Sequence, residues 1–308
     1  MRIVFMGTPE FAVASLKAVA NSGHEVVSVV TNIDEPQGRG LKVVAPPIKT
    51  MALSLGLPVI QVSSLRDPDF LDSLRRLVPD LIVVVAFRIL PDEVFTIPKF
   101  GTFNLHASLL PLYRGAAPIN WAIIKGEKET GVTTFILDEK VDTGKVIMQK
   151  RLLIGGDETA GELSGRLSVV GAEAVIETIE LIRSGRVVLM DQDNARATKA
   201  PKIKREDCVI VWSKSASENH NMIRGFSPEP GAFTFLNGRI LKIFGSRLTD
   251  GHEGLRDGEI VAEGGQLFVG CGDRGLEITE LQMEGKRRLS AGEFVRGARL
   301  PRGTKLGA

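Results

Sequence analysis

The chain has 308 residues, of which 43% are hydrophobic and 25% are charged, and its formal net charge is +2. This composition is typical of a globular protein with one or two domains. No apolar run approaches the roughly 20 residues of a membrane-spanning helix, and the first residues predict a strand rather than a signal peptide. Two isolated cysteines argue against a disulfide framework and favour a cytoplasmic location. Four histidines without a close pair argue against a metal site. No membrane partner is expected.

The first half of the chain alternates short apolar runs with amphipathic segments, which predicts an α/β domain with a Rossmann-like, mostly parallel sheet. The most apolar run, 81–86, is expected to be a central strand that is buried on both faces. The first turn carries one glycine where a dinucleotide-binding fold needs three, so NAD binding is not expected. Strands are predicted at 2–6, 25–31, 58–61, 81–86 and 103–106, and helices at 11–22, 48–55, 67–77 and 118–125.

The second half of the chain predicts two further strands, a long helix and then a change of pattern. Strands at 132–137 and 145–152 flank a polar loop, and residues 159–184 have helical periodicity. After a further helix at 215–225, Asn237-Gly238 between alternating runs is a strong hairpin signal and introduces about five short strands. We therefore predict a catalytic domain at 1–189, a linker at 190–207 and a small β-barrel or sandwich domain at 208–308.

Two polar residues at the end of a predicted strand are the main candidates for chemistry. Asn104 and His106 stand two apart, so both point to the same side of the strand. An Asn amide can donate to a developing oxyanion, and a His can exchange a proton with an amine or an alkoxide. An Asp could orient that imidazole, and both Asp138 and Asp142 in the following polar loop are available for this. The pattern indicates an acyl-type transfer.

A hydrolase with a catalytic serine is the alternative at this motif. Ser108 has no G-x-S-x-G context and lies only two residues beyond His106, which disfavours a Ser-His-Asp triad. We expect Ser108 to make local hydrogen bonds to the backbone instead.

Basic residues gather in three places where they could contact nucleic-acid phosphates. The long loop at 32–47 has a basic tip, the predicted linker is charged, and a further cluster lies near the carboxyl end. Solvated surface charge is an equally plausible interpretation of all three. The candidates are Arg39, Lys42, Lys202, Lys204, Arg205, Lys286 and Arg287.

These motifs together resemble the 10-formyltetrahydrofolate-dependent formyltransferases, and among them the branch that formylates initiator methionyl-tRNA. The shared catalytic motifs are Asn104-x-His106-x-Ser108-Leu-Leu-Pro111, Arg114-Gly-Ala-Ala-Pro118, Glu129-Thr-Gly-Val132 and Asp142-Thr-Gly144. The similarity to the tRNA branch extends to Phe5-Met-Gly-Thr-Pro-Glu-Phe-Ala12, Gly38-Arg-Gly40 and Arg224-Gly-Phe-Ser-Pro-Glu-Pro-Gly231.

The resemblance implies that Asn104, His106 and Asp142 form the catalytic set, which favours Asp142 over Asp138. It implies an OB-like carboxyl-terminal domain and, with it, tRNA contacts by the basic residues named above. It also implies 10-formyltetrahydrofolate as the formyl donor. Separately, we expect the protein to be a monomer. The residues implied for the donor site are Phe87, Ile89, Leu90, Ser108, Leu109, Leu110, Pro111 and Val141.

The sequence departs from the family pattern at two places. The segment Ala86–Pro91 is one residue shorter than is common and contains Arg88, and Ile210-Val-Trp212 lacks the usual Asp. Rival interpretations are a sugar-nucleotide formyltransferase, an amidohydrolase that releases formate, and a non-catalytic RNA-binding protein. A glycinamide ribonucleotide formyltransferase would normally stop near residue 200, so the additional β domain disfavours it.

Overall fold

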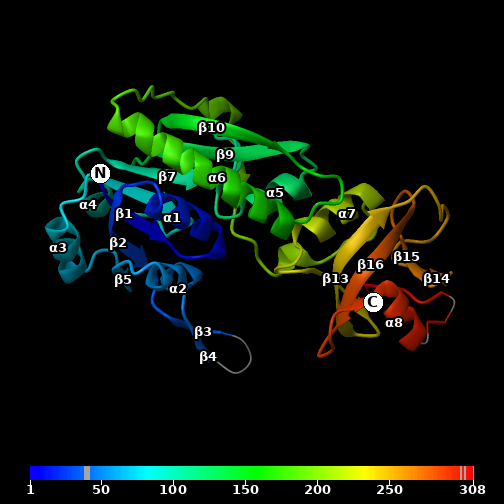
Figure 1. Cartoon of the computed structure of the whole chain (residues 1–308). Coiled ribbons are helices and arrows are strands. Elements are labelled where there is room, and N and C mark those ends of the chain that lie inside the picture. The colour runs from blue at the N-terminus through cyan, green and yellow to red at the C-terminus, as the bar shows by residue number, and fades with distance from the viewer. Residues whose placement is uncertain (38–41, 299, 302, 308) are drawn as a thin grey trace. The chain divides into compact units, whose positions relative to one another are not determined.

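The computed structural model describes residues 1–37, 42–298, 300–301 and 303–307, and its contacts divide the chain into two compact units (Figure 1). The α/β unit comprises Met1–Gly115, Thr130–Leu152 and Ser164–Lys199. The β unit comprises Ala116–Glu129, Leu153–Leu163 and Ala200–Ala308. Each unit therefore contains chain segments that are distant in sequence, and the domain boundaries predicted after residues 189 and 207 stay predictions.

The α/β unit is built on a seven-stranded sheet with the order β10-β9-β7-β6-β1-β2-β5. Strand β1 runs parallel to β2 and β6, β7 runs parallel to β6, and β9 runs antiparallel to β7. The predicted α/β fold with a mostly parallel sheet is thus confirmed. The strands are β1 (Arg2–Gly7), β2 (Glu25–Thr31), β5 (Val59–Gln61), β6 (Leu81–Val85), β7 (Thr102–His106), β9 (Glu129–Ile136) and β10 (Val146–Leu153), with a short β8 (Arg114–Gly115) after the motif.

Strand β6 is the buried centre of this sheet, as its composition predicts. All five of its residues are buried, and β1 and β7 pair with it on either side. Its Ile82 and Val84 belong to an apolar cluster with Val4 and Met6 of β1 and Leu74 of a flanking helix. A strand without polar positions is stable only when both faces of the sheet are covered.

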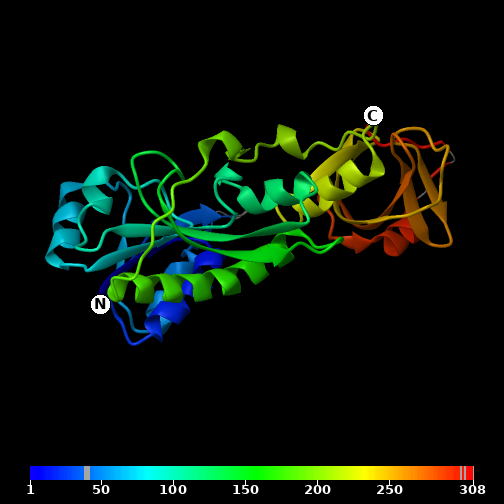
Figure 2. The ribbon, with the colours of Figure 1, turned by 90° about the horizontal axis from the view of Figure 1, so that it is seen from above.

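Helices cover this sheet, and the packing of α6 shows which face carries Asn104 and His106. Figures 1 and 2 show α1 (Val13–Ala20) and α6 (Ala160–Arg183) on the same face. Gly171 of α6 packs so closely against β7 that a Cβ there would lie 2.6 Å from the Leu105 side chain. Leu105 therefore faces α6, and the alternation along the strand turns Asn104 and His106 to the opposite face. The other helices of the unit are η1 (Glu10–Ala12), α2 (Pro47–Ser54), α3 (Pro68–Arg76), α4 (Asp92–Phe95) and η2 (Asn194–Arg196).

The long loop predicted at 32–47 contains a short hairpin of β3 (Glu35–Gln37) and β4 (Lys42–Val44). Its base is fixed by Lys49, whose Nζ lies 2.7 Å from Asp34 Oδ2, while Gln61 donates to Asp34 Oδ1 at 2.7 Å. Arg39, a predicted tRNA contact at the tip, lies outside the described residues, as does the side chain of Lys42.

The β unit is an antiparallel sheet with the order β12-β13-β16-β15-β14, and β17 pairs with β16. The turn between β12 and β13 has positive φ at both Asn237 and Gly238, as the predicted tight hairpin requires. The antiparallel β domain is therefore confirmed. The strands are β12 (Ala232–Leu236), β13 (Arg239–Leu248), β14 (Ile260–Glu263), β15 (Gln266–Gly270), β16 (Gly275–Met283) and β17 (Leu289–Ser290); the helices are α5 (Pro118–Ile124), η3 (Glu206–Cys208), α7 (Ala216–Gly225) and α8 (Ala291–Gly297), and β11 (Lys199–Ala200) lies where the two units meet in sequence.

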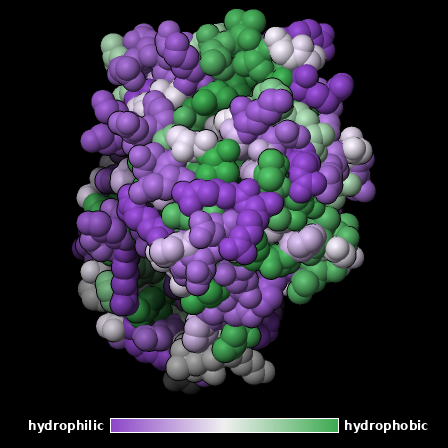
Figure 3. All heavy atoms as spheres, turned by 90° about the vertical axis from the view of Figure 1, so that its left-hand side faces the viewer, coloured by the Kyte–Doolittle hydropathy of each residue, from purple (hydrophilic) through white to green (hydrophobic). Residues whose placement is uncertain are grey.

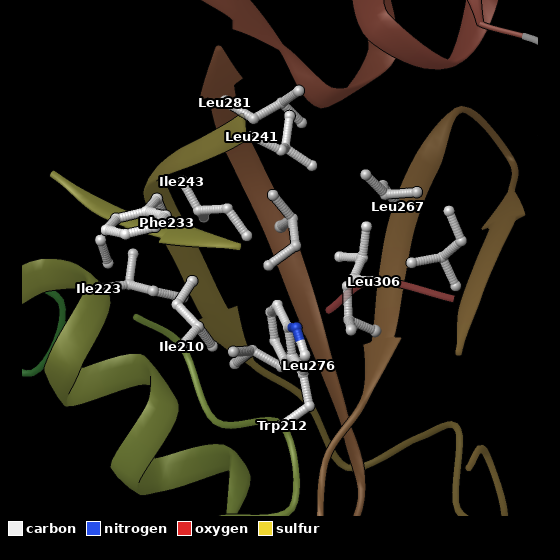
Figure 4. Close-up of a cluster of buried hydrophobic side chains, with 14 of the residues drawn as sticks. Ile210, Trp212, Ile223, Phe233, Leu241, Ile243, Leu267, Leu276, Leu281 and Leu306 are labelled. Carbon is white, nitrogen blue, oxygen red and sulfur yellow. The ribbon is translucent and has the colours of Figure 1, made fainter. Parts of the chain in front are cut away.

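An apolar cluster fills the centre of the β unit. Figure 4 shows Leu241, Leu267 and Leu281 on its strands. Trp212 is buried in the same cluster and donates from Nε1 to Thr234 Oγ1 at 3.1 Å. Trp212 is the last residue of Ile210-Val-Trp212, the segment that departs from the family pattern, and Val211 in this segment is exposed.

Helix α8 was not predicted from the sequence, although its start carries a recognisable signal. Ser290 and Glu293 form a reciprocal capping box, in which each side chain accepts a hydrogen bond from the other residue's backbone N–H. The helix has only seven residues, so the apolar periodicity is too short to recognise.

Hydrophilic and hydrophobic side chains are interspersed on the side of the molecule seen in Figure 3. Within the described ranges, no helix is both long and apolar enough to cross a membrane.

Candidate active site

Strand β7 presents Asn104 and His106 from the face of the α/β sheet opposite α6. Asn104 pairs in register with Val84 and Phe135, and His106 pairs with Thr133. Asn104 is half-buried, and its amide has no hydrogen-bond partner among the residues that the structure describes. An amide of this kind can donate its N–H groups to a bound substrate.

His106 is buried, and its imidazole is held by the backbone of the loop that follows it. Its Nε2 lies 2.9 Å from the Tyr113 carbonyl oxygen. A carbonyl only accepts hydrogen bonds, so Nε2 carries a proton, and the lone pair of the neutral ring is on Nδ1. Nδ1 lies 3.7 Å from Asp142 Oδ2. Nδ1 is therefore the atom that can take up a proton, and Asp142 is the anion that would stabilise the resulting charge.

Asp142 reaches this position from the loop between β9 and β10. Its Oδ2 accepts a 2.8 Å hydrogen bond from the Gly115 N–H, so the carboxylate is held by the end of the motif loop. Its φ of 56° is left-handed, which is uncommon outside glycine. Asp138 makes a different set of contacts, because it accepts from Thr143 Oγ1 and the Lys140 N–H. Of the two candidates, Asp142 is the one beside His106.

The loop after His106 is organised by a buried threonine of β9. Thr133 Oγ1 donates to the Ser108 carbonyl at 2.6 Å and accepts from the Leu110 N–H at 3.1 Å. Gln149 Nε2 adds a 2.7 Å bond to the Leu110 carbonyl. Ser108 itself is fully buried and donates to the Leu112 carbonyl at 2.6 Å, so its expected local hydrogen bonding is confirmed. These contacts give the 108–112 loop a defined backbone.

The residues predicted to bind the formyl donor lie in three segments of the α/β unit. Leu109 and Pro111 are half-buried and Leu110 is buried, in the loop just described, whereas Val141 is exposed beside Asp142. Phe87 and Leu90 pack into the core, and the Ile89 side chain is exposed. As donor contacts, these residues stay predictions.

A cavity of about 710 Å³ borders the segment that contains Ile89 and Leu90. Arg66 and Arg88 line it together with Asp92 and Glu139, whereas none of the three catalytic candidates does. Arg88 donates to the carbonyls of Val62 and Ser63 at 2.7 and 2.8 Å, and its guanidinium lies over the Phe87 ring. The shortened Ala86–Pro91 segment is thus tied to the neighbouring chain through Arg88.

The basic residues predicted to bind tRNA lie on the surface of the β unit where the structure describes them. Lys202 and Lys286 are exposed. Lys204 lies 3.8 Å from Glu206, and Arg287 lies 2.9 Å from Glu293. Arg205 is above the Phe233 ring. Both exposed ion pairs can exchange a carboxylate for a phosphate at small cost, and the tRNA contacts themselves stay predictions.

Sequence reasoning missed several residues that shape the site. Tyr113 acts through its backbone carbonyl, which any residue type supplies, so the sequence carries no signal for it. Thr133, Gln149 and Gln192 contact the site through side chains, from positions 16 to 50 residues away from their partners. Polar residues on strands and in loops are common, and only the fold shows which of them converge.

The arrangement can support attack of an amine on an acyl carbon. Asn104 supplies a hydrogen-bond donor, His106 a proton acceptor at Nδ1 and Asp142 a negative charge beside it. The three residues come from the ends of β7 and the β9–β10 loop, and the crevice beyond the carboxyl ends of strands is the usual ligand position in open α/β sheets.

Sequence comparison defines the class. The formyl transferase profile matches residues 1–179, and the profile of the formyl transferase C-terminal domain matches residues 202–299. The methionyl-tRNA formyltransferase of Geobacter sulfurreducens is 47% identical over 309 residues, which cover 100% of this chain and 97% of that protein. The methionyl-tRNA formyltransferase of Geotalea uraniireducens is 48% identical over 308 residues, which cover 100% and 98%. The chain belongs to the methionyl-tRNA formyltransferases, so the predicted family is confirmed.

The fold is shared with solved formyltransferase structures. An N-formyltransferase from Helicobacter canadensis, in complex with folinic acid and dTDP-3-aminofucose, aligns with a TM-score of 0.68 at 22% identity, over 92% of this chain and 99% of that chain. At this identity the match shows a common fold, and the catalytic residues are argued from the geometry above.

Proposed function

We propose that this protein transfers the formyl group of 10-formyltetrahydrofolate to the free α-amino group of methionine on initiator methionyl-tRNA, in the cytoplasm, for translation initiation. The observation that carries the proposal is the cluster of Asn104, His106 and Asp142 in a chain that is similar along its whole length to methionyl-tRNA formyltransferases. The folinic acid bound by the Helicobacter canadensis relative supports a folate as the donor.

The chemistry begins with attack of the methionine amine on the formyl carbon, which forms a C–N bond and an oxyanion. The Asn104 amide donates to this oxyanion. His106 Nδ1 accepts the proton lost by the amine, and Asp142 stabilises the imidazolium. The bond between the formyl carbon and folate N10 then breaks, and N10 takes the proton. The products are formyl-methionyl-tRNA and tetrahydrofolate, so no other reactant is needed.

The donor is proposed to lie between two described segments of the α/β unit. Leu109, Leu110 and Pro111 form one wall beside the catalytic residues, and Ile89 and Leu90 form the other. The cavity next to Ile89 is lined by Arg66 and Arg88, whose guanidinium groups suit the carboxylates of a folate tail, and also by Asp92 and Glu139.

The tRNA is proposed to contact the basic side chains of the linker, of the β unit and of the loop that carries Arg39. Phosphate contacts by Lys and Arg weaken steeply as the salt concentration rises. Arg39→Ala is expected to raise the KM for methionyl-tRNA while leaving the KM for the folate unchanged. An equal change in both constants would contradict the assignment of the loop to tRNA.

An acceptor test decides between this function and its rivals. Purified protein is incubated with 10-formyltetrahydrofolate and with methionyl-tRNA, uncharged tRNA or an amino-sugar nucleotide in separate reactions. Formylation of methionyl-tRNA alone is the expected result. Formylation of the sugar alone, or release of formate without any acceptor, would overturn the proposal.

A further inference from the structure

The segment that follows α6 crosses to the face of the sheet that carries the catalytic residues (Figure 2). Met190 and Val146 form an antiparallel bridge, in which each N–H donates to the other's carbonyl at 2.9 and 2.8 Å. Farther along, Thr198 accepts from the Arg114 N–H at its carbonyl and from the Tyr113 N–H at its hydroxyl, at 2.9 and 2.8 Å. The segment is thus fixed to the sheet at one end and to the motif loop at the other.

Gln192 lies between these two attachments and uses both ends of its amide. Its Nε2 donates to the carbonyl of Asp142 at 3.0 Å and to that of Gly144 at 2.7 Å. Its Oε1 accepts from Arg114, at 3.2 Å from Nε and 2.7 Å from Nη2. The half-buried amide therefore bridges the motif loop and the turn that carries Asp142.

Arg114 fixes the direction in which this amide can act. A guanidinium has donors only, so the oxygen of the Gln192 amide must face Arg114. The two N–H groups then point at the carbonyls of Asp142 and Gly144, which only accept. Each donor in the bridge therefore meets an acceptor. In the reversed amide, Oε1 would face the two carbonyl oxygens and the Nε2 N–H groups would face the N–H groups of Arg114.

The Asp142 turn needs such support because of its backbone. Asp142 is in the left-handed region, which is unfavourable for a residue with a side chain and persists only when the surroundings hold it. Gly144 is equally constrained, since a Cβ there would collide with the Ile136 carbonyl. The Gln192 bonds reach the carbonyls on both sides of Thr143 and so restrain the rotation that would turn the Asp142 carboxylate away from His106.

We infer that Gln192 is a positioning residue for catalysis, held in orientation by Arg114, and that it keeps Asp142 Oδ2 opposite His106 Nδ1. This inference rests on the proposed function, because it gives a role to a residue outside the catalytic set in the same formyl transfer. Gln192 does not touch the reacting atoms and acts only through the Asp142 turn.

The substitution Gln192→Glu tests this at constant shape. Glutamate keeps an acceptor for Arg114 but replaces both N–H donors with an oxygen that faces two carbonyls. We expect kcat to fall by about tenfold to a hundredfold, because small misplacements of catalytic groups have effects of this size. The KM for the folate and the thermal midpoint should stay close to those of the wild type. Asp191→Asn is the matched control, since Asp191 is the adjacent residue and is exposed, and it forms an ion pair with Lys145.

A double-mutant cycle separates positioning from general support of the fold. If Gln192 acts through Asp142, then Gln192→Glu adds no further loss to Asp142→Ala. Arg114→Met should lower kcat to a similar extent as Gln192→Glu, because it frees the amide to rotate. Unchanged kcat in Gln192→Glu, or losses that multiply in the double variant, would overturn the inference. The wild type is assayed in parallel: its failure to formylate methionyl-tRNA overturns the proposed function instead.

Discussion

Two buried histidines, one in each unit, have similar surroundings but different expected roles. Both His106 and His220 place Nε2 near a backbone carbonyl and have an aspartate close to the ring: Asp142 for the first and Asp157 for the second. They differ at Nδ1. In His220 this atom accepts from Ser246 Oγ at 3.0 Å, whereas in His106 it faces the Asp142 carboxylate at 3.7 Å.

The difference shows that a His beside an Asp does not by itself define a catalytic pair. His220 is satisfied as a neutral ring by Ser246 and Gly156, and burial lowers its pKa below the ordinary 6.5, so it resists protonation. Its aspartate is mostly exposed to solvent. His106 has an atom ready for a proton, a largely buried carboxylate to stabilise the charge, and, two residues away, the Asn104 amide, which has no hydrogen-bond partner within the described part of the chain. The environment of His106 supports proton transfer, and that of His220 supports a structural role.

The largest effect is expected from removing the histidine of the α/β unit. His106→Ala eliminates the proton acceptor and should lower the formylation rate by about 10²–10⁴, the range typical of lost general acid–base catalysis. Its circular dichroism spectrum should match that of the wild type. Steady-state kinetics with methionyl-tRNA measure the effect, and turnover within tenfold of the wild type would remove His106 from the mechanism. His220→Ala, assayed in the same way per folded molecule, is the contrasting variant and should retain turnover.

The two aspartates extend the comparison. In Asp142→Asn, the amide oxygen can still accept from the Gly115 N–H, but the negative charge beside His106 is lost. We expect kcat to fall by about 10²–10³, similar to the loss of one preorganised electrostatic group elsewhere. Asp157→Asn, which removes an exposed charge beside His220, should change kcat less than twofold. Comparable losses in both variants would show that the two Asp–His contacts are equivalent.

The smallest effect concerns pH and the stability of the β unit. Because burial lowers the pKa of His220 in the folded state, the unfolded chain binds a proton first as the pH falls below about 6.5. His220 therefore destabilises the fold progressively from this pH down to its folded pKa, where the effect levels off. His220→Gln offers a donor and an acceptor but does not titrate. The thermal midpoint of the wild type minus that of His220→Gln should therefore narrow or change sign on acidification from pH 8 to pH 5. A constant difference would contradict the burial argument.

Sequence patterns predicted most elements of both units, because apolar periodicity reports burial directly. The run at 81–86, the hairpin at Asn237-Gly238 and the long helix near 159–184 all appear close to their expected bounds. Helix α8 was not predicted, because seven residues contain too few apolar positions to show a helical period. The shared face of Asn104 and His106 was also predictable, since it depends only on alternation along one strand.

The sequence by itself determined the two-part architecture, the polar pair on β7 and, through its motifs, the family. Only the tertiary structure decided the rest of the site. It showed that Tyr113 holds the imidazole by a carbonyl and that the Gly115 N–H holds the carboxylate of Asp142, which the family motif already favoured over Asp138. It also showed that Gln192 reaches the Asp142 turn from 50 residues away. Periodic patterns encode which side of an element is buried. Hydrogen bonds between loops that are distant in sequence depend on where the fold places the end of each strand. A local sequence pattern carries no information about that placement.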